Sequence, residues 1–183
     1  MLDSYMSNTY AANLENCSAK IQAEHSFWMT LALQEAQKAE QLQEVPIGAV
    51  LVSSQGKMLS RAHNMCISTH NPCGHAEILA IQKAAQSVNN YRLPKSVLYV
   101  TLEPCIMCLG AMVQARISGL VFGTRDPKAG SIVSNLCAAE LSWLNHYFLV
   151  QEGLLARDCS QILKDFFAGL RVKKVSDLLG QGN

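Results

Sequence analysis

The run SVLYVTL at residues 96–102 is the feature that most constrains the fold of this chain. It is apolar almost throughout and strongly β-prone, which is typical of a central strand covered on both faces. Pro104 follows at once, and the next segment, CIMCLGAMVQARI, has the pattern of a helix. We therefore expect a buried strand that passes directly into a helix, as in α/β domains.

The rest of the chain supplies the other layers of such a domain. Short apolar runs bounded by turn residues predict four more strands, at 49–52, 57–62, 119–123 and 148–153. Helical spacing predicts three more helices, at 27–43 with Ser26 as N-cap, 75–87 and 154–174. The first two strands form a hairpin. Strands that alternate with helices after a hairpin predict one mixed five-stranded sheet with helices on both faces.

Length and composition predict a globular protein without a membrane span. The 183 residues suit one domain, with 49% hydrophobic and 16% charged residues. No apolar run approaches the roughly 18 residues that a membrane span needs. The N-terminus lacks the basic start and apolar stretch of a secretory signal. The seven cysteines cannot all pair within the chain, so we expect a reducing, cytoplasmic location.

The net charge of +1 argues against nucleic-acid binding driven by charge alone. Basic residues nevertheless gather near the end of the chain, at Arg171, Lys173 and Lys174. Such a cluster fits either an ordinary solvated surface or a patch that faces a polyanion.

Cys105 and Cys108 lie three residues apart at the predicted start of a helix. Pro104 suits the first helical position, where its missing N–H is harmless. Residues three apart share a helix face, and the positive helix N-terminus favours thiolates. By itself the pair fits a metal site, a redox pair or small packed side chains.

His75 and Glu77 open the helix before the buried strand. An H-x-E at one helix start followed by P-C-x-x-C at the next is the signature of zinc nucleobase deaminases. His75, Cys105 and Cys108 are thus the predicted ligands of one Zn²⁺. Glu77 is the predicted proton shuttle beside a water at the fourth position, as in a catalytic zinc site.

Cys73 is a rival ligand because it lies two residues before His75. A site with Cys73 as the fourth ligand would be closed and structural, and would leave Glu77 without a role. We prefer the open site, since structural zinc sites usually repeat short paired spacings.

The sequence resembles the bacterial tRNA-specific adenosine deaminases in several further motifs. These are FWMTLALQEAQKA, EVPIGAVLV, HAEILAI, NYRL, LYVTLEPCIMCLGAM, VFGTRDPKAGS, LNH and DFF. The resemblance covers residues 26–171, the predicted deaminase domain. Residues 1–25 are then an N-terminal extension, loose or forming a short helix, and 172–183 a C-terminal tail.

The resemblance implies a cytidine-deaminase-like three-layer α/β/α sandwich and a homodimer with one zinc per subunit. The implied reaction converts the wobble adenosine of an arginine tRNA anticodon stem-loop to inosine. Asn64 matches an asparagine that contacts the flipped nucleotide, and Asp126 matches an acid near the preceding nucleotide. Arg171, Lys173 and Lys174 are candidate phosphate contacts.

Two departures from the family pattern bear on RNA binding. Cys73 and Gly74 replace a common Thr-Ala pair before HAE, and Ala168 stands where a basic residue often follows the two phenylalanines. Two other functions remain open. One is a small-molecule deaminase acting on guanine or cytosine, which would use the same chemistry. The other is a zinc-stabilised RNA-binding module without turnover, which would have no use for Glu77.

Overall fold

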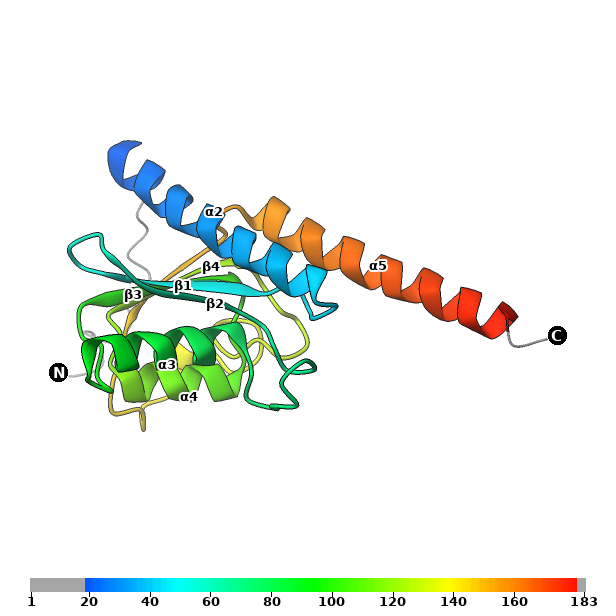
Figure 1. Ribbon diagram of the computed structural model, residues 1–183. Coiled ribbons are helices and arrows are strands. Elements are labelled where there is room, and N and C mark those ends of the chain that lie inside the picture. The colour runs from blue at the N-terminus through cyan, green and yellow to red at the C-terminus, as the bar shows by residue number, and fades with distance from the viewer. Residues whose placement is uncertain (1–18, 181–183) are drawn as a thin grey trace.

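The structure is a computed structural model, and it describes residues 19–180 of the chain. Figure 1 shows a central sheet with α2 and α5 over one face and α3 and α4 over the other. The predicted three-layer sandwich is therefore confirmed. Among the described residues, no helix is both long and apolar enough to cross a membrane.

The sheet has five strands in the order β2-β1-β3-β4-β5. Their bounds are β1 Gly48–Ser53, β2 Met58–His63, β3 Ser96–Leu102, β4 Gly119–Thr124 and β5 Leu149–Glu152. β1 pairs antiparallel with both β2 and β3. β3, β4 and β5 run parallel. The predicted mixed sheet is confirmed, with each strand within about two residues of its expected bounds.

The described α-helices are α2 Ala19–Gln41, α3 Ala76–Val88, α4 Ile106–Ala115 and α5 Ala156–Gly180. A short 3-10 helix, η2 at Ala138–Glu140, was not predicted. Its three residues are too few to produce a helical periodicity in the sequence.

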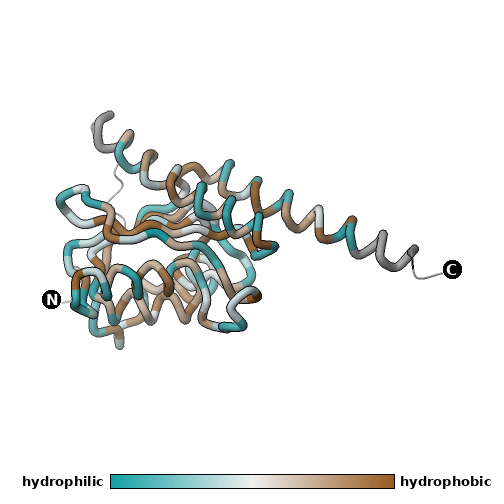
Figure 2. Tube along the Cα trace, viewed as in Figure 1, coloured by the Kyte–Doolittle hydropathy of each residue, from teal (hydrophilic) through white to brown (hydrophobic). Residues whose placement is uncertain are grey.

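β3 separates two hydrophobic cores, as the apolar run at 96–102 predicts. Leu98 and Val100 belong to the core under α3 and α4, whereas Tyr99 belongs to the core under α2 and α5. All three are at most 3% exposed. Figure 2 shows hydrophobic residues concentrated in the central strands. Gly48 lets α2 approach the sheet closely, because a Cβ there would clash with the carbonyl of Ala32.

The N-terminal boundary differs from the prediction. α2 begins at Ala19, so Ser26 is not an N-cap but lies inside the helix, where its carbonyl accepts a 2.9 Å hydrogen bond from Thr30 Oγ1. Residues 19–25 are rich in good helix formers, and His25 Nδ1 lies 2.8 Å from the hydroxyl of Tyr99. The remainder of the predicted extension, residues 1–18, lies outside the described residues.

The C-terminal helix is also longer than predicted. α5 runs without a break past residue 171 and ends at Gly180 rather than near residue 174. No proline or glycine lies between Gly169 and Gly180, so nothing in the sequence stops the helix earlier. Figure 1 shows its last turns projecting beyond the sheet.

Candidate metal and catalytic site

Strand register brings the predicted site residues to one edge of the sheet. Leu102 at the end of β3 pairs with Thr124 at the end of β4, and Gly48 at the start of β1 pairs with His63. The Gly48 N–H also donates to Thr101 Oγ1 at 3.2 Å, which joins these strand ends. The chain leaves β2, β3 and β4 here, so this edge collects the loops that follow three strands.

Two helices begin at this edge with unusual N-caps. His75 is the N-cap of α3 and Cys105 is the N-cap of α4. Neither side chain makes a hydrogen bond to its own helix. Side chains at N-caps usually satisfy a helix N–H, so these two are free for another task. Pro104 therefore precedes the N-cap and is not the first helical residue. This corrects the prediction, because α4 begins two residues later than expected, at Ile106.

The side chains of His75, Cys105 and Cys108 converge with the spacing of metal ligands. Nδ1 of His75 lies 3.5 Å from each sulfur, and the two sulfurs lie 3.7 Å apart. A tetrahedral Zn²⁺ bound at ordinary lengths would separate two sulfurs by about 3.8 Å and a sulfur from a nitrogen by about 3.5 Å. The donor set and its spacing thus fit one such ion.

The two thiols already share their protons unequally. A hydrogen bond from Cys108 is the main cause that lowers the pKa of Cys105 to about 3. The same hydrogen bond, together with burial, raises the pKa of Cys108. One sulfur is therefore a thiolate at neutral pH, and a bound dication would favour the thiolate form of both.

Glu77 occupies the first turn of α3, two residues after His75, and is 4% exposed. Burial is the main cause that raises the pKa of its carboxyl, and the charge of Cys105 raises this pKa further. The charge of His75 acts in the opposite direction. A carboxyl with a raised pKa can both take and give a proton near neutral pH. The site therefore combines a metal-ligand set with a buried acid–base group.

Asn64 follows β2 directly and is 5% exposed. Its side-chain Nδ2 donates to Glu44 Oε2 at 3.1 Å, and its Oδ1 accepts from the Cys66 thiol at 3.4 Å. Asn64 is thus a buried, hydrogen-bonded residue at the same sheet edge as the metal ligands.

Asp126 lies in the loop after β4, and Glu103 holds this loop in place. The buried Glu103 carboxylate accepts hydrogen bonds from Asp126 N at 3.0 Å and from three backbone N–H groups and one hydroxyl farther along the same loop. These belong to Ile132, Val133 and Ser134. Gly130 packs against Glu103 so closely that a Cβ would clash with its carboxylate.

Comparison with known proteins reveals the family. The MafB19-like deaminase family model matches residues 23–171. A tRNA-specific adenosine deaminase of Haemophilus influenzae is 44% identical over 158 residues, which is 86% of this chain and 91% of that protein. The chain belongs to the tRNA-specific adenosine deaminase family.

Solved structures agree with this membership. A structure from a study of A-to-I editing by tRNA:A34 deaminases at the wobble position of transfer RNA superimposes with a TM-score of 0.73. It is 40% identical and the match covers 75% of this chain and 99% of that one. A guanine deaminase of Bacillus subtilis matches less completely, with a TM-score of 0.53, 31% identity and coverage of 55% and 64%.

The remaining predicted residues of this family member lie apart from the metal-ligand set. Arg171 and Lys173 are exposed on α5, which packs on the opposite face of the sheet from α3 and α4. The side chain of Lys174 lies outside the described residues. Cys73 is exposed and does not belong to the metal-ligand group found among the described residues.

Two further residues, Glu44 and Glu103, belong to the site and were not predicted from the sequence. Both are buried acids with no ion-pair partner among the described residues. Glu103 stands directly before a proline in EPC, and Glu44 stands two positions before one in EVP. Each lies beside an apolar run. An acid in such a setting is a usable signal, because a buried carboxylate needs dedicated hydrogen-bond donors.

Proposed function

We propose that this protein hydrolytically deaminates the wobble adenosine of an arginine tRNA anticodon stem-loop to inosine. Membership of the tRNA-specific adenosine deaminases supports the reaction and the RNA substrate. The observation that carries the proposal is the convergence of His75, Cys105 and Cys108 with the buried carboxyl of Glu77 beside them. An RNA-binding module without turnover would not need that buried acid.

One Zn²⁺ per subunit is the proposed metal, held by the imidazole of His75 and the two thiolates. Two thiolates and one neutral imidazole leave a fourth position open and bring the formal charge of a dication to zero. When bound, zinc would polarise a water for attack on an electron-poor ring carbon. Because thiolate ligands donate electron density to the metal, the bound water would be acidified less than in a site built from histidines alone. A protein base close by therefore matters more here.

Glu77 is the proposed base and then acid. It takes a proton from the attacking water as the new C–O bond forms at C6 of adenine. It then gives that proton to the ring nitrogen and transfers the proton of the new hydroxyl group to the amine. The C=O bond of the product forms as the C–N bond breaks and ammonia leaves. Its burial suits both steps, since a raised pKa brings the protonated and ionised forms of the carboxyl closer in free energy near neutral pH.

Asn64 and Asp126 are the proposed contacts to the flipped nucleotide and to its neighbour. Both follow strands that end at the edge where the metal ligands lie. Recognition of a flipped base at this site needs hydrogen-bond donors and acceptors that are already in position. Arg171, Lys173 and Lys174 are proposed to contact phosphates farther from the target, as bases of an RNA loop are splayed into the site.

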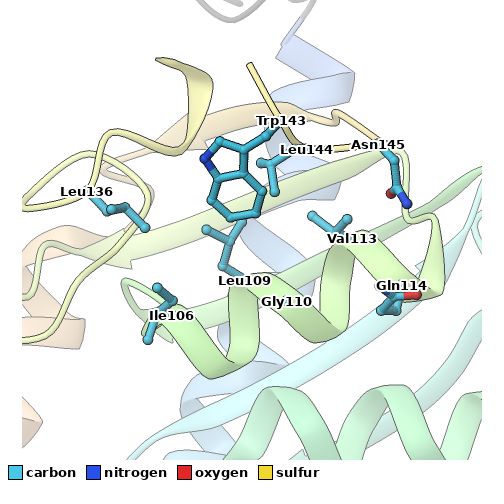
Figure 3. A pocket seen from close by; sticks show the side chains of 9 residues that line it. All are labelled: Ile106, Leu109, Gly110, Val113, Gln114, Leu136, Trp143, Leu144 and Asn145. Atoms are coloured by element: carbon cyan, nitrogen blue, oxygen red, sulfur yellow. The ribbon is translucent and has the colours of Figure 1, made fainter. Parts of the chain in front are cut away.

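A homodimer is proposed because an uncharged apolar pocket lies on α4, the helix that carries both cysteine ligands. The pocket has a volume of about 250 Å³. Figure 3 shows Trp143 over Leu109 and Ile106 at one end. Trp143 is 72% and Ile106 62% exposed, and both line this one pocket, so they form an exposed apolar patch of the kind that marks interfaces. A second copy that buries this surface would complete the assembly through a two-fold interface.

Trp143→Glu tests this interface, because it would bury a charge in the contact between the two copies. We expect the variant to sediment as a monomer. Tyr91→Glu is the matched control, since Tyr91 is 64% exposed and lies outside the pocket. A Trp143→Glu variant that remains a dimer would overturn the proposed interface.

Residues 26–171 remain the proposed deaminase domain, with 1–25 as an extension and 172–183 as a tail. The family model, which matches 23–171, supports these limits. Since α2 and α5 cross both limits without a break, they mark where family similarity ends and not a gap in the fold. A tRNA substrate and the unpaired described cysteines favour a cytoplasmic location.

The alternative function is a small-molecule nucleobase deaminase, favoured by the likeness to guanine deaminase. One experiment separates the two. The protein is incubated with an arginine tRNA anticodon stem-loop, and separately with guanine, cytosine and adenosine. Inosine in the RNA supports the proposal, whereas ammonia from guanine or cytosine alone supports the alternative.

A further inference from the structure

Glu44 is a buried carboxylate without a cationic partner. It lies just after α2 and is 0% exposed. No ion pair to Glu44 occurs among residues 19–180. Burial of a charge is costly unless hydrogen bonds replace its water shell. The contacts that replace this shell therefore indicate what the residue does.

All of these contacts come from the loop between β2 and α3. Oε2 of Glu44 accepts a hydrogen bond from Asn64 Nδ2 at 3.1 Å. Oε1 accepts two from Ser68, from the backbone N–H at 2.6 Å and from the hydroxyl at 2.9 Å. One acid from the end of α2 thus holds two points of the loop that begins at Asn64 and ends at His75.

The contact with Asn64 decides which way its amide faces. A side-chain amide has a donor end and an acceptor end, and an ionised carboxylate only accepts. Glu44 therefore fixes Nδ2 on its own side and turns Oδ1 away, toward the Cys66 thiol. One N–H of Nδ2 and one lone pair of Oδ1 remain for another partner.

The same loop is tied at its ends to the metal-ligand region. Asn64 N donates to Ile47 O at 3.0 Å, and Met65 N donates to Gly74 O at 2.9 Å, one residue before His75. Among residues 19–180, the hydrogen bonds of Ser68 to Glu44 are the only ones that join residues 66–73 to a segment outside the loop. Glu44 consequently sets the position of Asn64 relative to the residues that hold the metal.

We propose that Glu44 is a positioning residue that presents the Asn64 amide to the target nucleobase in one fixed orientation. The inference rests on the proposed function, because it takes Asn64 as the contact to the flipped base. Glu44 itself touches neither the metal ligands nor the reacting atoms; it acts through Asn64.

Glu44→Gln tests the proposal, because glutamine keeps the shape but has only one acceptor oxygen. It therefore cannot accept from Asn64 and from Ser68 at the same time. We expect kcat/KM for the anticodon stem-loop to fall about 10- to 100-fold, as for loss of a hydrogen bond to a charged group. Zinc content and the melting temperature are measured in parallel. Glu40→Gln, an acid near the end of α2 without this contact, is the matched control and should match the wild type.

The decisive comparison is a double-mutant cycle with Asn64→Ala. If Glu44 acts through Asn64, Glu44→Gln should change kcat/KM by less than about threefold once Asn64 is removed. Independent effects that multiply would overturn the proposal. A purely structural role would give that same outcome, equal fold-losses in both backgrounds, and would add lost zinc or a lower melting temperature.

Ser68→Ala keeps the proposal testable if Glu44→Gln does not fold. This variant removes one of the three hydrogen bonds and leaves the carboxylate in place. It should lower kcat/KM in the wild-type background and not in the Asn64→Ala background. If the wild type acted on guanine and not on RNA, the proposed function would fail, and the same cycle measured on guanine would still decide the role of Glu44.

Discussion

His75 and Cys105 occupy the same position, the N-cap, in two neighbouring helices, and Nδ1 of His75 lies 3.5 Å from the sulfur of Cys105. Neither side chain caps its own helix. A serine or aspartate at either place would stabilise the helix by about 1 kcal/mol. The chain forgoes that stability at two adjacent helix starts, and the two freed side chains meet at one point.

Cys73→Ser separates the open metal site from a closed one. Because Cys73 is exposed and lies outside the ligand group, we expect zinc content to stay unchanged and kcat/KM to stay within about threefold. Cys108→Ser is the contrasting variant and should lose the metal. Metal analysis of both proteins gives the answer, and loss of zinc from the Cys73 variant would make Cys73 a ligand.

Glu103→Ala should loosen the loop after β4 while the metal remains bound. Several N–H groups of residues 126–134 would lose their acceptor, which costs about 3 kcal/mol of folding free energy or more. We expect hydrogen exchange at Val133 and Ser134 to become much faster. Glu152→Ala, which removes only the exposed partner of Arg125, is the control. Unchanged protection at both amides would contradict this role.

How much of the site was readable in the sequence differs from residue to residue. His75 and Glu77 lie two positions apart, and Cys105 and Cys108 lie three apart. Local spacing therefore brings the members of each pair close. Glu44 and Asn64 are 20 residues apart, and only the return of β2 beside β1 joins them. No periodicity encodes such a contact, because strand register decides it.

The ends of the outer helices illustrate a second limit. Ser26 looked like an N-cap because it precedes an apolar helical pattern, but the polar residues before it also favour a helix. Contact of His25 with Tyr99, 74 residues away, helps to hold that first part of α2 on the sheet. Tertiary packing thus set a boundary that local pattern could not.

Glu35→Gln tests the ionic cluster beneath α2, where the Glu35 carboxylate meets Lys38, Arg61 and His63. Burial alone would raise the pKa of Glu35, but hydrogen bonds from Lys38 and His63 bring it below the ordinary value of 4.5. A lowered folded pKa adds stability above pH 4.5 that is lost as the pH falls through the folded value. We expect the variant to be about 1–2 kcal/mol less stable near pH 7.

The difference in unfolding free energy between wild type and Glu35→Gln, measured by urea titration, should shrink from about pH 7 to about pH 3. The reason is that the glutamine cannot titrate. Arg61 stays charged throughout this range, so it does not produce the change. A gap that is constant with pH would show that ionisation of Glu35 adds nothing to stability.

Alanine at the three basic positions of α5 should weaken RNA binding and flatten its dependence on salt. Each lost phosphate contact lowers the slope of log K against log salt by about 0.7 for single-stranded RNA. Three exposed lysines elsewhere serve as the matched control. These are Lys57, Lys83 and Lys95. Equal affinity and slope for both triple variants would exclude Arg171, Lys173 and Lys174 as phosphate contacts.

The most direct test of the account measures zinc and turnover together, in the wild type and in Glu77→Gln. We expect one zinc per chain in both proteins. Conversion of the anticodon stem-loop adenosine to inosine should fall at least about a hundredfold in the variant, as for loss of a general acid–base. A wild type that binds no zinc, or a Glu77→Gln variant that still forms inosine at the wild-type rate, would contradict the account.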